Sequence, residues 1–216
     1  MIIAKNIKFS YGNLKVLKDI SLEINKGEFI SIIGSSGAGK TTLLNILGTL
    51  QKLQDGSLKI NNQEIKNLND TQLSKFRNEQ IGFVFQFHNL LPEFTVLENV
   101  CLPALINNVN KVKIEEKAKQ ILQSLNMVDK INQKPNELSG GEQQRVSVAR
   151  SLINSPTILL ADEPSGNLDS KNAKDLHNIL LKLNKEKKQT VVVITHNNDL
   201  AKLADRVIKI EDGKII

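Results

Sequence analysis

The chain has 216 residues, of which 40% are hydrophobic and 24% charged, and its formal net charge is +6. This balance is typical of a globular protein with one large domain or two small ones. No apolar stretch reaches the length of about 18 residues that a membrane-spanning helix needs. The first residues turn polar at Lys5, so we expect no secretory signal.

The number of cysteines and the distribution of charge limit the cellular compartments and the classes of binding partner that we expect. Cys101 is the single cysteine, so we expect no disulfide within the chain, a reducing cytoplasm, and a small buried hydrophobic role for Cys101. The lysines are scattered apart from a short cluster at 185–188, which suits the C-terminal end of a helix. Aromatic and basic residues do not alternate in the way that favours base stacking. We therefore expect no nucleic-acid partner.

Taken in chain order, the predicted elements alternate between strands and helices. The runs that predict strands lie at 2–4, 20–24, 29–33, 57–60, 81–85, 157–161, 190–194, 206–210 and 214–216. Turns are expected at 25–28, 55–56 and 212–213. Apolar residues at spacings of three and four predict helices after residue 42, along 114–125 and along 173–183. Continuous apolar runs suit strands covered on both faces, so the alternation predicts an α/β fold with a parallel sheet.

A glycine-rich loop lies between the strand predicted at 29–33 and the helix that follows. Its residues are Gly34, Ser35, Ser36, Gly37, Ala38, Gly39, Lys40, Thr41 and Thr42, a complete phosphate-binding pattern in the strand–loop–helix context that it requires. Glycines let consecutive backbone N–H groups curl around phosphate oxygens, and the helix adds its positive end. We expect Lys40 to reach the β- and γ-phosphates of a nucleotide and the Thr41 hydroxyl to hold Mg²⁺. A plain turn with an exposed lysine is the alternative, which the flanking elements disfavour.

Two adjacent carboxylates, Asp162 and Glu163, end the apolar run at 157–161. Ligands bind at the carboxyl ends of strands in open α/β sheets. Adjacent strand residues point to opposite faces, so we expect the two carboxylates to have separate tasks. Asp162 suits the Mg²⁺ held with Thr41, and Glu163 suits a water that attacks the γ-phosphate. Two solvated acids at a strand end are the alternative, which the upstream glycine-rich loop disfavours.

A second glycine-containing motif occupies residues 138–145. Ser139 and Glu142 have the spacing of a capping box, which predicts the start of a helix. Gly140 and Gly141 in the first turn leave backbone N–H groups open to an anion. A well-capped helix without a ligand is the alternative.

Residues 138–143, taken with the loop at 34–42 and the run that ends in Asp162 and Glu163, resemble the ATP-binding cassette (ABC) ATPases. The resemblance covers the chain from about residue 2 to residue 213, in the order of the family's motifs. It implies an ATPase with a P-loop NTPase core on a mainly parallel sheet, an N-terminal antiparallel β subdomain and a helical signature subdomain. Residues 1–216 would form one domain, with the helical subdomain inserted at roughly 87–153.

The resemblance also implies roles for residues that are uninformative alone. Gln86 looks like the glutamine that contacts Mg²⁺ and the attacking water, and His196 like the histidine that senses the γ-phosphate. Tyr11 looks like the aromatic residue that stacks on adenine. Asp169 ends the segment 165–169, which looks like the D-loop of the family.

The resemblance further implies a dimer of two such chains that sandwich two ATP molecules head to tail. The substrate is ATP and the cofactor is Mg²⁺, with Thr41, Gln86 and Asp162 as its expected partners. The signature residues that would act on the partner's ATP are Ser139, Gly140, Gly141 and Glu142. Loss of the γ-phosphate would release the two bodies, which is how hydrolysis drives movement.

A narrower resemblance rests on residues 87–100 and 161–169. Both segments look like the lipoprotein-releasing (LolD-type) branch, whose ATPase works with separate membrane subunits to extract lipoproteins from the inner membrane towards the outer membrane. Ser165 departs from the threonine that relatives usually carry but keeps the hydroxyl. The chain would lie at the cytoplasmic face of the inner membrane, with the apolar, irregular segment 87–100 docked on a membrane permease subunit. A plain loop packed on the helical subdomain is the alternative for that segment.

Other functions of the same chemistry stay open from the residues alone. Macrolide-export ATPases and the cell-division ATPase that regulates wall hydrolases share residues 87–100 in weaker form. A nucleic-acid ATPase is disfavoured, because only about a hundred residues separate Thr42 from Leu138, without sustained heptads. Transport and regulation use the same ATPase chemistry, so the residues do not distinguish between them. The sequence also does not specify the cargo, the membrane partner, the rates or the direction of movement. His88 and His177 match no motif, so we expect both to be structural.

Overall fold

The computed structural model describes residues 2–107 and 110–216, so residue 1 and residues 108–109 of the expected domain and insertion lie outside it. The strands are β1 (Ile2–Tyr11), β2 (Leu14–Ile24), β3 (Phe29–Ile33), β4 (Asp55–Ile60), β5 (Gln63–Glu64), β6 (Ile81–Phe85), β7 (Ile158–Asp162), β8 (Thr190–Ile194), β9 (Arg206–Glu211) and β10 (Lys214–Ile215). The helices are α1 (Lys40–Leu47), α2 (Asp70–Gln80), α3 (Val96–Leu105), α4 (Lys111–Ser124), α5 (Gly140–Leu152), α6 (Ser170–Lys187) and α7 (Asn198–Lys202). None of these helices is long and apolar enough to cross a membrane.

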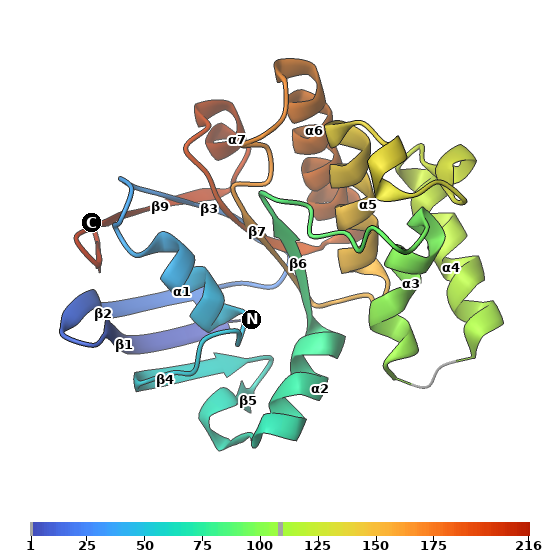
Figure 1. The fold of residues 1–216 in the computed structure, drawn as a ribbon. Coiled ribbons are helices and arrows are strands. Elements are labelled where there is room, and N and C mark those ends of the chain that lie inside the picture. Colours follow the sequence, from blue (N-terminus) through green and yellow to red (C-terminus); the bar gives the residue numbers. More distant parts are fainter. Residues whose placement is uncertain (1, 108–109) are drawn as a thin grey trace.

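Two sheets form the framework, as the resemblance predicts. A six-stranded sheet has the order β10-β9-β3-β8-β7-β6, and its strands are parallel apart from the terminal β9–β10 pair. A four-stranded antiparallel sheet has the order β2-β1-β4-β5. Figure 1 shows this smaller sheet and α1 on one side of the molecule and α3, α4 and α5 on the other. The predicted α/β core and antiparallel N-terminal subdomain are confirmed.

The four neighbouring strands β3, β8, β7 and β6 are largely buried on both faces, and their residues alternate between two hydrophobic cores. Ile30, Ile32 and Leu160 belong to the core shared with α1 and the antiparallel sheet. Phe29 and Leu159 belong to the core shared with α3 to α6. This alternation follows from the two-residue period of a strand. Cys101 of α3 is buried in the second core, as expected, and burial raises the pKa of its thiol to about 11.

The antiparallel sheet is longer and less regular than the sequence indicates. We predict strands at 2–4 and 20–24, whereas β1 and β2 form one continuous hairpin with register shifts after Ala4. Asn6 and Asp19 have positive φ angles of 52° and 91° and join through an Asn6 Nδ2 to Asp19 Oδ1 hydrogen bond of 2.9 Å. These bulges break the alternation of apolar and polar residues by which a strand is recognised.

The turn predicted at Asp55 and Gly56 is wrong, because both residues lie within β4. Gly56 has φ of 91°, and a Cβ there would lie 2.5 Å from the Lys5 carbonyl oxygen. Gly56 therefore permits a β-bulge at the point where the register of β4 with β1 shifts. We had expected a turn before the strand at this position.

The segment 87–100, expected to be irregular throughout, is irregular only up to Thr95. Thr95 and Glu98 form a capping box that starts α3. The fully buried Asn99 accepts from the Leu91 backbone N–H at 2.8 Å, and its amide nitrogen donates to the carbonyl oxygens of Leu91, Phe94 and Thr95, each at 3.0 Å. One buried side chain thus fixes the backbone of the turn that precedes α3.

Candidate active site

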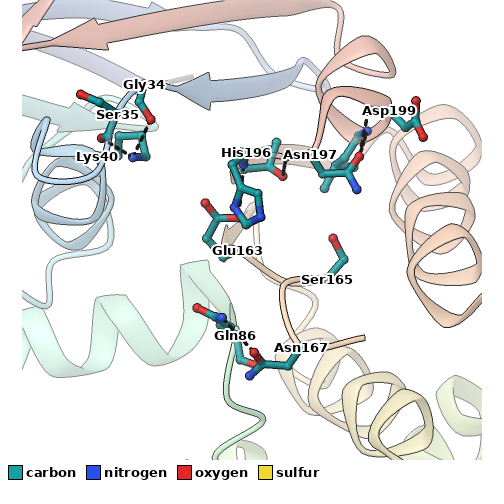
Figure 2. Close-up of polar contacts among 12 residues, drawn as sticks. Gly34, Ser35, Lys40, Gln86, Glu163, Ser165, Asn167, His196, Asn197 and Asp199 are labelled. Carbon is teal, nitrogen blue, oxygen red and sulfur yellow. Dashed lines mark hydrogen bonds and ion pairs between the residues drawn. The ribbon is translucent and has the colours of Figure 1, made fainter. Parts of the chain in front are cut away.

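The residues predicted to bind nucleotide and Mg²⁺ and to act on the attacking water lie mostly at one edge of the six-stranded sheet. β3, β8, β7 and β6 are neighbours and parallel, so their carboxyl ends lie together. The register pairs Ile32 with Ile194, Ile194 with Asp162, and Asp162 with Phe85. Figure 2 shows the result: Lys40, Glu163, His196 and Gln86 face one region although they come from four separate parts of the chain.

The glycine-rich loop is shaped to present backbone N–H groups. Gly39 precedes α1 with φ of 100°, and no side chain caps the first turn, which leaves N–H groups at the positive end of the helix without a side-chain partner. Gly34 has φ of 152°, and a Cβ there would lie 2.1 Å from the Ile210 carbonyl oxygen of β9. Lys40 Nζ donates to the carbonyl oxygens of Gly34 at 3.0 Å and Ser35 at 2.8 Å. The lysine therefore lies folded over its own loop.

A cleft of about 670 Å³ opens at this edge. The predicted residues that line it are Tyr11, Gly34, Ser36, Gly37, Gly39, Lys40, Thr41, Thr42, Gln86, Asp162, Glu163 and His196. Ser35 and Ala38 do not line it, and Ala38 is buried. Leu14, Val16 and Ile194 also line the cleft, and we did not predict them. Leu14 and Val16 alternate along β2 beside Tyr11, so the hairpin would have indicated them had its full length been recognised.

Tyr11 lies at the mouth of the cleft with half of its side chain exposed. Its ring packs edge-to-face against Phe9, with the ring centroids 4.9 Å apart. This contact fixes the ring orientation and leaves a ring face available for stacking.

Asp162 and Glu163 both line the cleft, so the expectation that they point to opposite faces is wrong. β7 ends at Asp162, and Glu163 has a left-handed backbone with φ of 45°, where strand alternation no longer applies. Burial raises the pKa of the Asp162 carboxyl above its usual value, while a hydrogen bond from the Thr41 side chain acts in the opposite direction.

The donor set around Asp162 fits Mg²⁺. A hydroxyl and a carboxylate, those of Thr41 and Asp162, meet at the base of the cleft, and oxygen atoms are the ligands that Mg²⁺ prefers. In the part of the chain that the structure describes, no three His, Cys, Asp or Glu side chains form a metal cage. Proteins usually bind Mg²⁺ through one or two carboxylates together with substrate phosphates.

Glu163 and His196 form a direct pair. His196 Nδ1 lies 2.8 Å from Glu163 Oε2, and the His196 backbone N–H donates to the same oxygen at 3.3 Å. The Glu163 side chain is 19% exposed and that of His196 is 74% exposed. Figure 2 shows the imidazole beside the carboxylate. The pair holds one oxygen of the carboxylate at the cleft, which suits a group that orients or deprotonates a water.

Gln86 contacts the loop that follows Glu163. Its Nε2 donates to Asn167 Oδ1 at 3.0 Å, and Asn167 Nδ2 donates to the Gln86 carbonyl oxygen at 3.4 Å. Gln144 makes a related connection that we did not predict: it is buried, and its Nε2 donates to the carbonyl oxygens of Phe85 at 3.1 Å and Pro164 at 2.7 Å. A glutamine on the apolar side of an amphipathic helix is the signal that could have indicated it.

The signature residues lie outside this cleft. The predicted capping box is confirmed: Ser139 Oγ accepts from the Glu142 backbone N–H, and the Glu142 carboxylate accepts from the Ser139 backbone N–H at 2.8 Å. None of Ser139, Gly140, Gly141 or Glu142 lines the cleft formed by the same chain. His88 Nε2 lies 2.9 Å from the Gly140 carbonyl oxygen, so this histidine braces the start of α5.

Asp169 caps α6 and so fixes the end of the expected D-loop. Its carboxylate accepts from the backbone N–H groups of Lys171 and Asn172 and from the Asn172 side chain at 2.6 Å. These hydrogen bonds, the one from the Asn172 backbone foremost, lower the pKa of Asp169.

Comparisons with known proteins identify the family of the chain. The family model for the ABC transporter matches residues 17–166. The lipoprotein-releasing system ATP-binding protein LolD of Bacteroides thetaiotaomicron is 53% identical over 215 residues, which cover 100% of this chain and 99% of that protein. The chain belongs to the ABC transporter family. The LolD protein of Cytophaga hutchinsonii is 54% identical over 213 residues, 99% of this chain and 97% of that protein.

Solved structures of ABC cassettes share the fold. The cassette MJ0796, described as a dimer in a post-hydrolysis state bound to ADP and Pi, has a TM-score of 0.90 and 42% identity. The match covers 100% of this chain and 96% of that chain. This ABC protein is therefore an ATP-binding and ATP-hydrolysing subunit.

The two signature glycines have different local constraints, which yields a first prediction. A Cβ on Gly141 would lie 2.2 Å from Asn172 Oδ1, whereas a Cβ on Gly140 meets nothing closer than Leu168 Cδ2 at 3.9 Å. Gly141→Ala should displace Asn172 and lower the free energy of unfolding by about 1–3 kcal/mol. Gly140→Ala should leave it nearly unchanged. Chemical denaturation of both variants checks this difference, and equal destabilisation would contradict it.

A second prediction concerns the buried carboxylate. Because the folded-state pKa of Asp162 is raised, its ionised form reduces stability above that pKa, and this effect vanishes at lower pH where the carboxyl is protonated. Asp162→Asn should raise the Tm by about 1–3 °C near pH 7.5, a small gain because solvent partly screens the charge, and the gain should disappear near pH 4. Calorimetry at both pH values measures it. The exposed Asp129→Asn is the matched control, and a gain independent of pH would contradict the assignment.

Proposed function

We propose that this protein is the ATPase subunit of a transporter that releases lipoproteins from the inner membrane towards the outer membrane. The observation that carries the proposal is the identity of about half of all residues, over essentially the full length, with proteins named for lipoprotein release. The macrolide export protein MacB of Campylobacter jejuni is 48% identical, but the match covers only 34% of that protein. The macrolide alternative therefore fits less well.

The proposed reaction follows from the placement of the site residues. Tyr11 stacks on adenine, and the backbone N–H groups of the glycine-rich loop, together with Lys40, take the phosphates. Thr41, Asp162 and Gln86 would hold Mg²⁺, and the ion would supply positive charge that neutralises the phosphates. Glu163 accepts a proton from the attacking water, and His196 holds the carboxylate in place and contacts the γ-phosphate.

The proposed dimer explains why the signature lies outside its own cleft. Ser139, Gly140 and Gly141 are then supplied to the γ-phosphate of the ATP held by the partner chain, and Asp169 lies at the contact between the chains. The dimeric cassette structures support this arrangement. The γ-phosphate links two bodies, so its loss releases them.

Glu163→Gln tests the roles of the carboxylate and the dimer together. The amide keeps the shape but cannot take a proton, so turnover should fall by at least about a hundredfold while ATP still binds. Because the γ-phosphate then persists, the variant should dimerise at saturating Mg-ATP. Light scattering with and without Mg-ATP measures the mass. A variant that stays monomeric, or that turns over at the wild-type rate, would count against the scheme.

The proposed docking surface comprises residues 87–100 at the cytoplasmic face of the membrane. Phe87, Leu91 and Phe94 are exposed apolar side chains. Arg150 of α5 donates to the carbonyl oxygens of His88 at 2.8 Å and Asn89 at 2.6 Å, which holds this backbone against the signature helix. A groove of about 440 Å³, lined by Phe85 and Ile106 among others, lies beside the surface. An apolar, braced surface of this kind suits a membrane permease subunit.

Co-purification from detergent-solubilised membranes of the source organism tests docking and cargo. The protein should retain a membrane subunit that carries bound lipoproteins. Glu93 is exposed on the docking surface, so Glu93→Lys should lose the membrane subunit while basal ATP hydrolysis persists. Glu116→Lys, an exposed charge reversal outside residues 87–100, is the matched control. A permease without lipoproteins would replace lipoprotein release by another transport function, and unaltered binding by Glu93→Lys would undercut the docking surface.

A further inference from the structure

His177 is a buried polar residue that the proposed reaction does not use. It lies on the inner face of α6 with 4% of its surface exposed, among apolar neighbours such as Leu176 and Leu180. Burial lowers the pKa of its imidazole, so the ring is neutral near pH 7. A buried neutral imidazole is costly unless its nitrogens are paired. The identity of its partner therefore indicates what the residue is for.

The partner of His177 is Ser165, two residues after Glu163. His177 Nε2 lies 3.1 Å from Ser165 Oγ, and Ser165 is 9% exposed. This bond joins α6 to the loop at 163–169, which begins at Glu163, a residue that lines the cleft. Figure 2 shows Ser165 on that loop, to the right of the Glu163–His196 pair and the Gln86–Asn167 pair.

The loop at 163–169 is held from other sides as well. Gln144 of α5 binds the Pro164 carbonyl oxygen, and Gln86 binds Asn167, as described above. His177 supplies the contact from α6, the helix that Asp169 caps. Without the His177–Ser165 bond, the loop would have no side-chain hydrogen bond between Pro164 and Asn167 among the described contacts.

His177 also lies near the segment that carries the second member of the catalytic pair. The negative charge of Asp199 on α7 opposes the effect of burial on the pKa of the His177 imidazole. α7 starts two residues after His196, and Asn197 caps it by accepting from the backbone N–H groups of Asp199 and Leu200. The printed hydrogen bond of the imidazole is the one to Ser165, which ties it to the loop after Glu163.

We propose that His177 is a positioning residue for ATP hydrolysis: through Ser165 it fixes the loop that follows Glu163 and keeps the Glu163 carboxylate on His196. This inference rests on the proposed roles of Glu163 and His196. In this proposal the Ser165 hydroxyl binds His177 of the same chain and does not bind a ligand. The nucleotide-binding groups of the glycine-rich loop and Tyr11 come from other elements, so the effect falls on the rate of the reaction and spares ATP binding.

Four single variants of the full chain and one double variant test the inference. His177→Phe and Ser165→Ala each remove the hydrogen bond, and each should lower kcat about tenfold while KM for ATP changes less than about twofold. Because both act through one bond, the double variant should be no slower than the slower single variant. His177→Gln places an amide near the position of Nε2, and Ser165→Thr keeps the hydroxyl, so these conservative variants should retain at least about half of the wild-type kcat. Steady-state hydrolysis at saturating Mg-ATP provides the measurement.

Thermal unfolding of the same variants separates positioning from plain stability. A lower Tm with wild-type kcat in both His177→Phe and Ser165→Ala would overturn the inference, as would losses that multiply in the double variant. If His177→Phe fails to fold, Ser165→Ala against Ser165→Thr decides alone: equal turnover by the two overturns it. Glu163→Gln keeps the two proposals distinguishable. Wild-type turnover in that variant refutes the catalytic pair, whereas an inactive Glu163→Gln beside an unaffected Ser165→Ala refutes only the role of His177.

Discussion

The parallel pairing of β3, β8, β7 and β6 is the constraint on which the site depends. Parallel neighbours bring their carboxyl ends to one edge of the sheet. The pairing of the strands therefore brings together residues from four distant parts of the chain, and contacts between the site side chains are not needed for this. The strands can lie side by side because their residues are apolar on both faces and two cores cover them. The geometry of the site is therefore a consequence of the burial of the strands between the two hydrophobic cores. A change in register by one residue would send the strand-end residues to the wrong face.

Much of this arrangement could be predicted because it depends on local patterns. The strands at Phe29–Ile33 and Ile81–Phe85 have the bounds that the apolar runs indicate. The loop at 34–42 and the capping box at Ser139 are determined by a few neighbouring residues. In the loop, glycines permit the required backbone angles, and in the capping box, side-chain oxygens accept hydrogen bonds from the first turn of the helix. The family resemblance then supplied the order of motifs, which isolated residues such as Gln86 and His196 cannot supply.

The elements that could not be predicted depend on long-range contacts. The β1–β2 hairpin is interrupted by bulges at Asn6 and Asp19, so its alternation is visible only when the partner strand is known. α2 buries none of its residues and so shows no apolar stripe. The left-handed backbone of Glu163 is the clearest case in the site, because a strand continuing through this position would turn the carboxylate away. Pro164 signals the end of the strand but does not specify the left-handed conformation of the residue before it.

The hydrogen bonds of Lys40 have a consequence for the choice of ligand. The ammonium group donates to the carbonyl oxygens of Gly34 and Ser35, and drawing it away leaves two loop carbonyls short of a partner. A neutral ligand forms only ordinary hydrogen bonds with the Lys40 ammonium group, which do not compensate for the two that are lost. Phosphate oxygens form stronger, charge-assisted hydrogen bonds with the same group. A ligand that draws the lysine away must therefore compete with two carbonyl oxygens of its own loop. These competing partners are backbone atoms, which no side-chain substitution can remove.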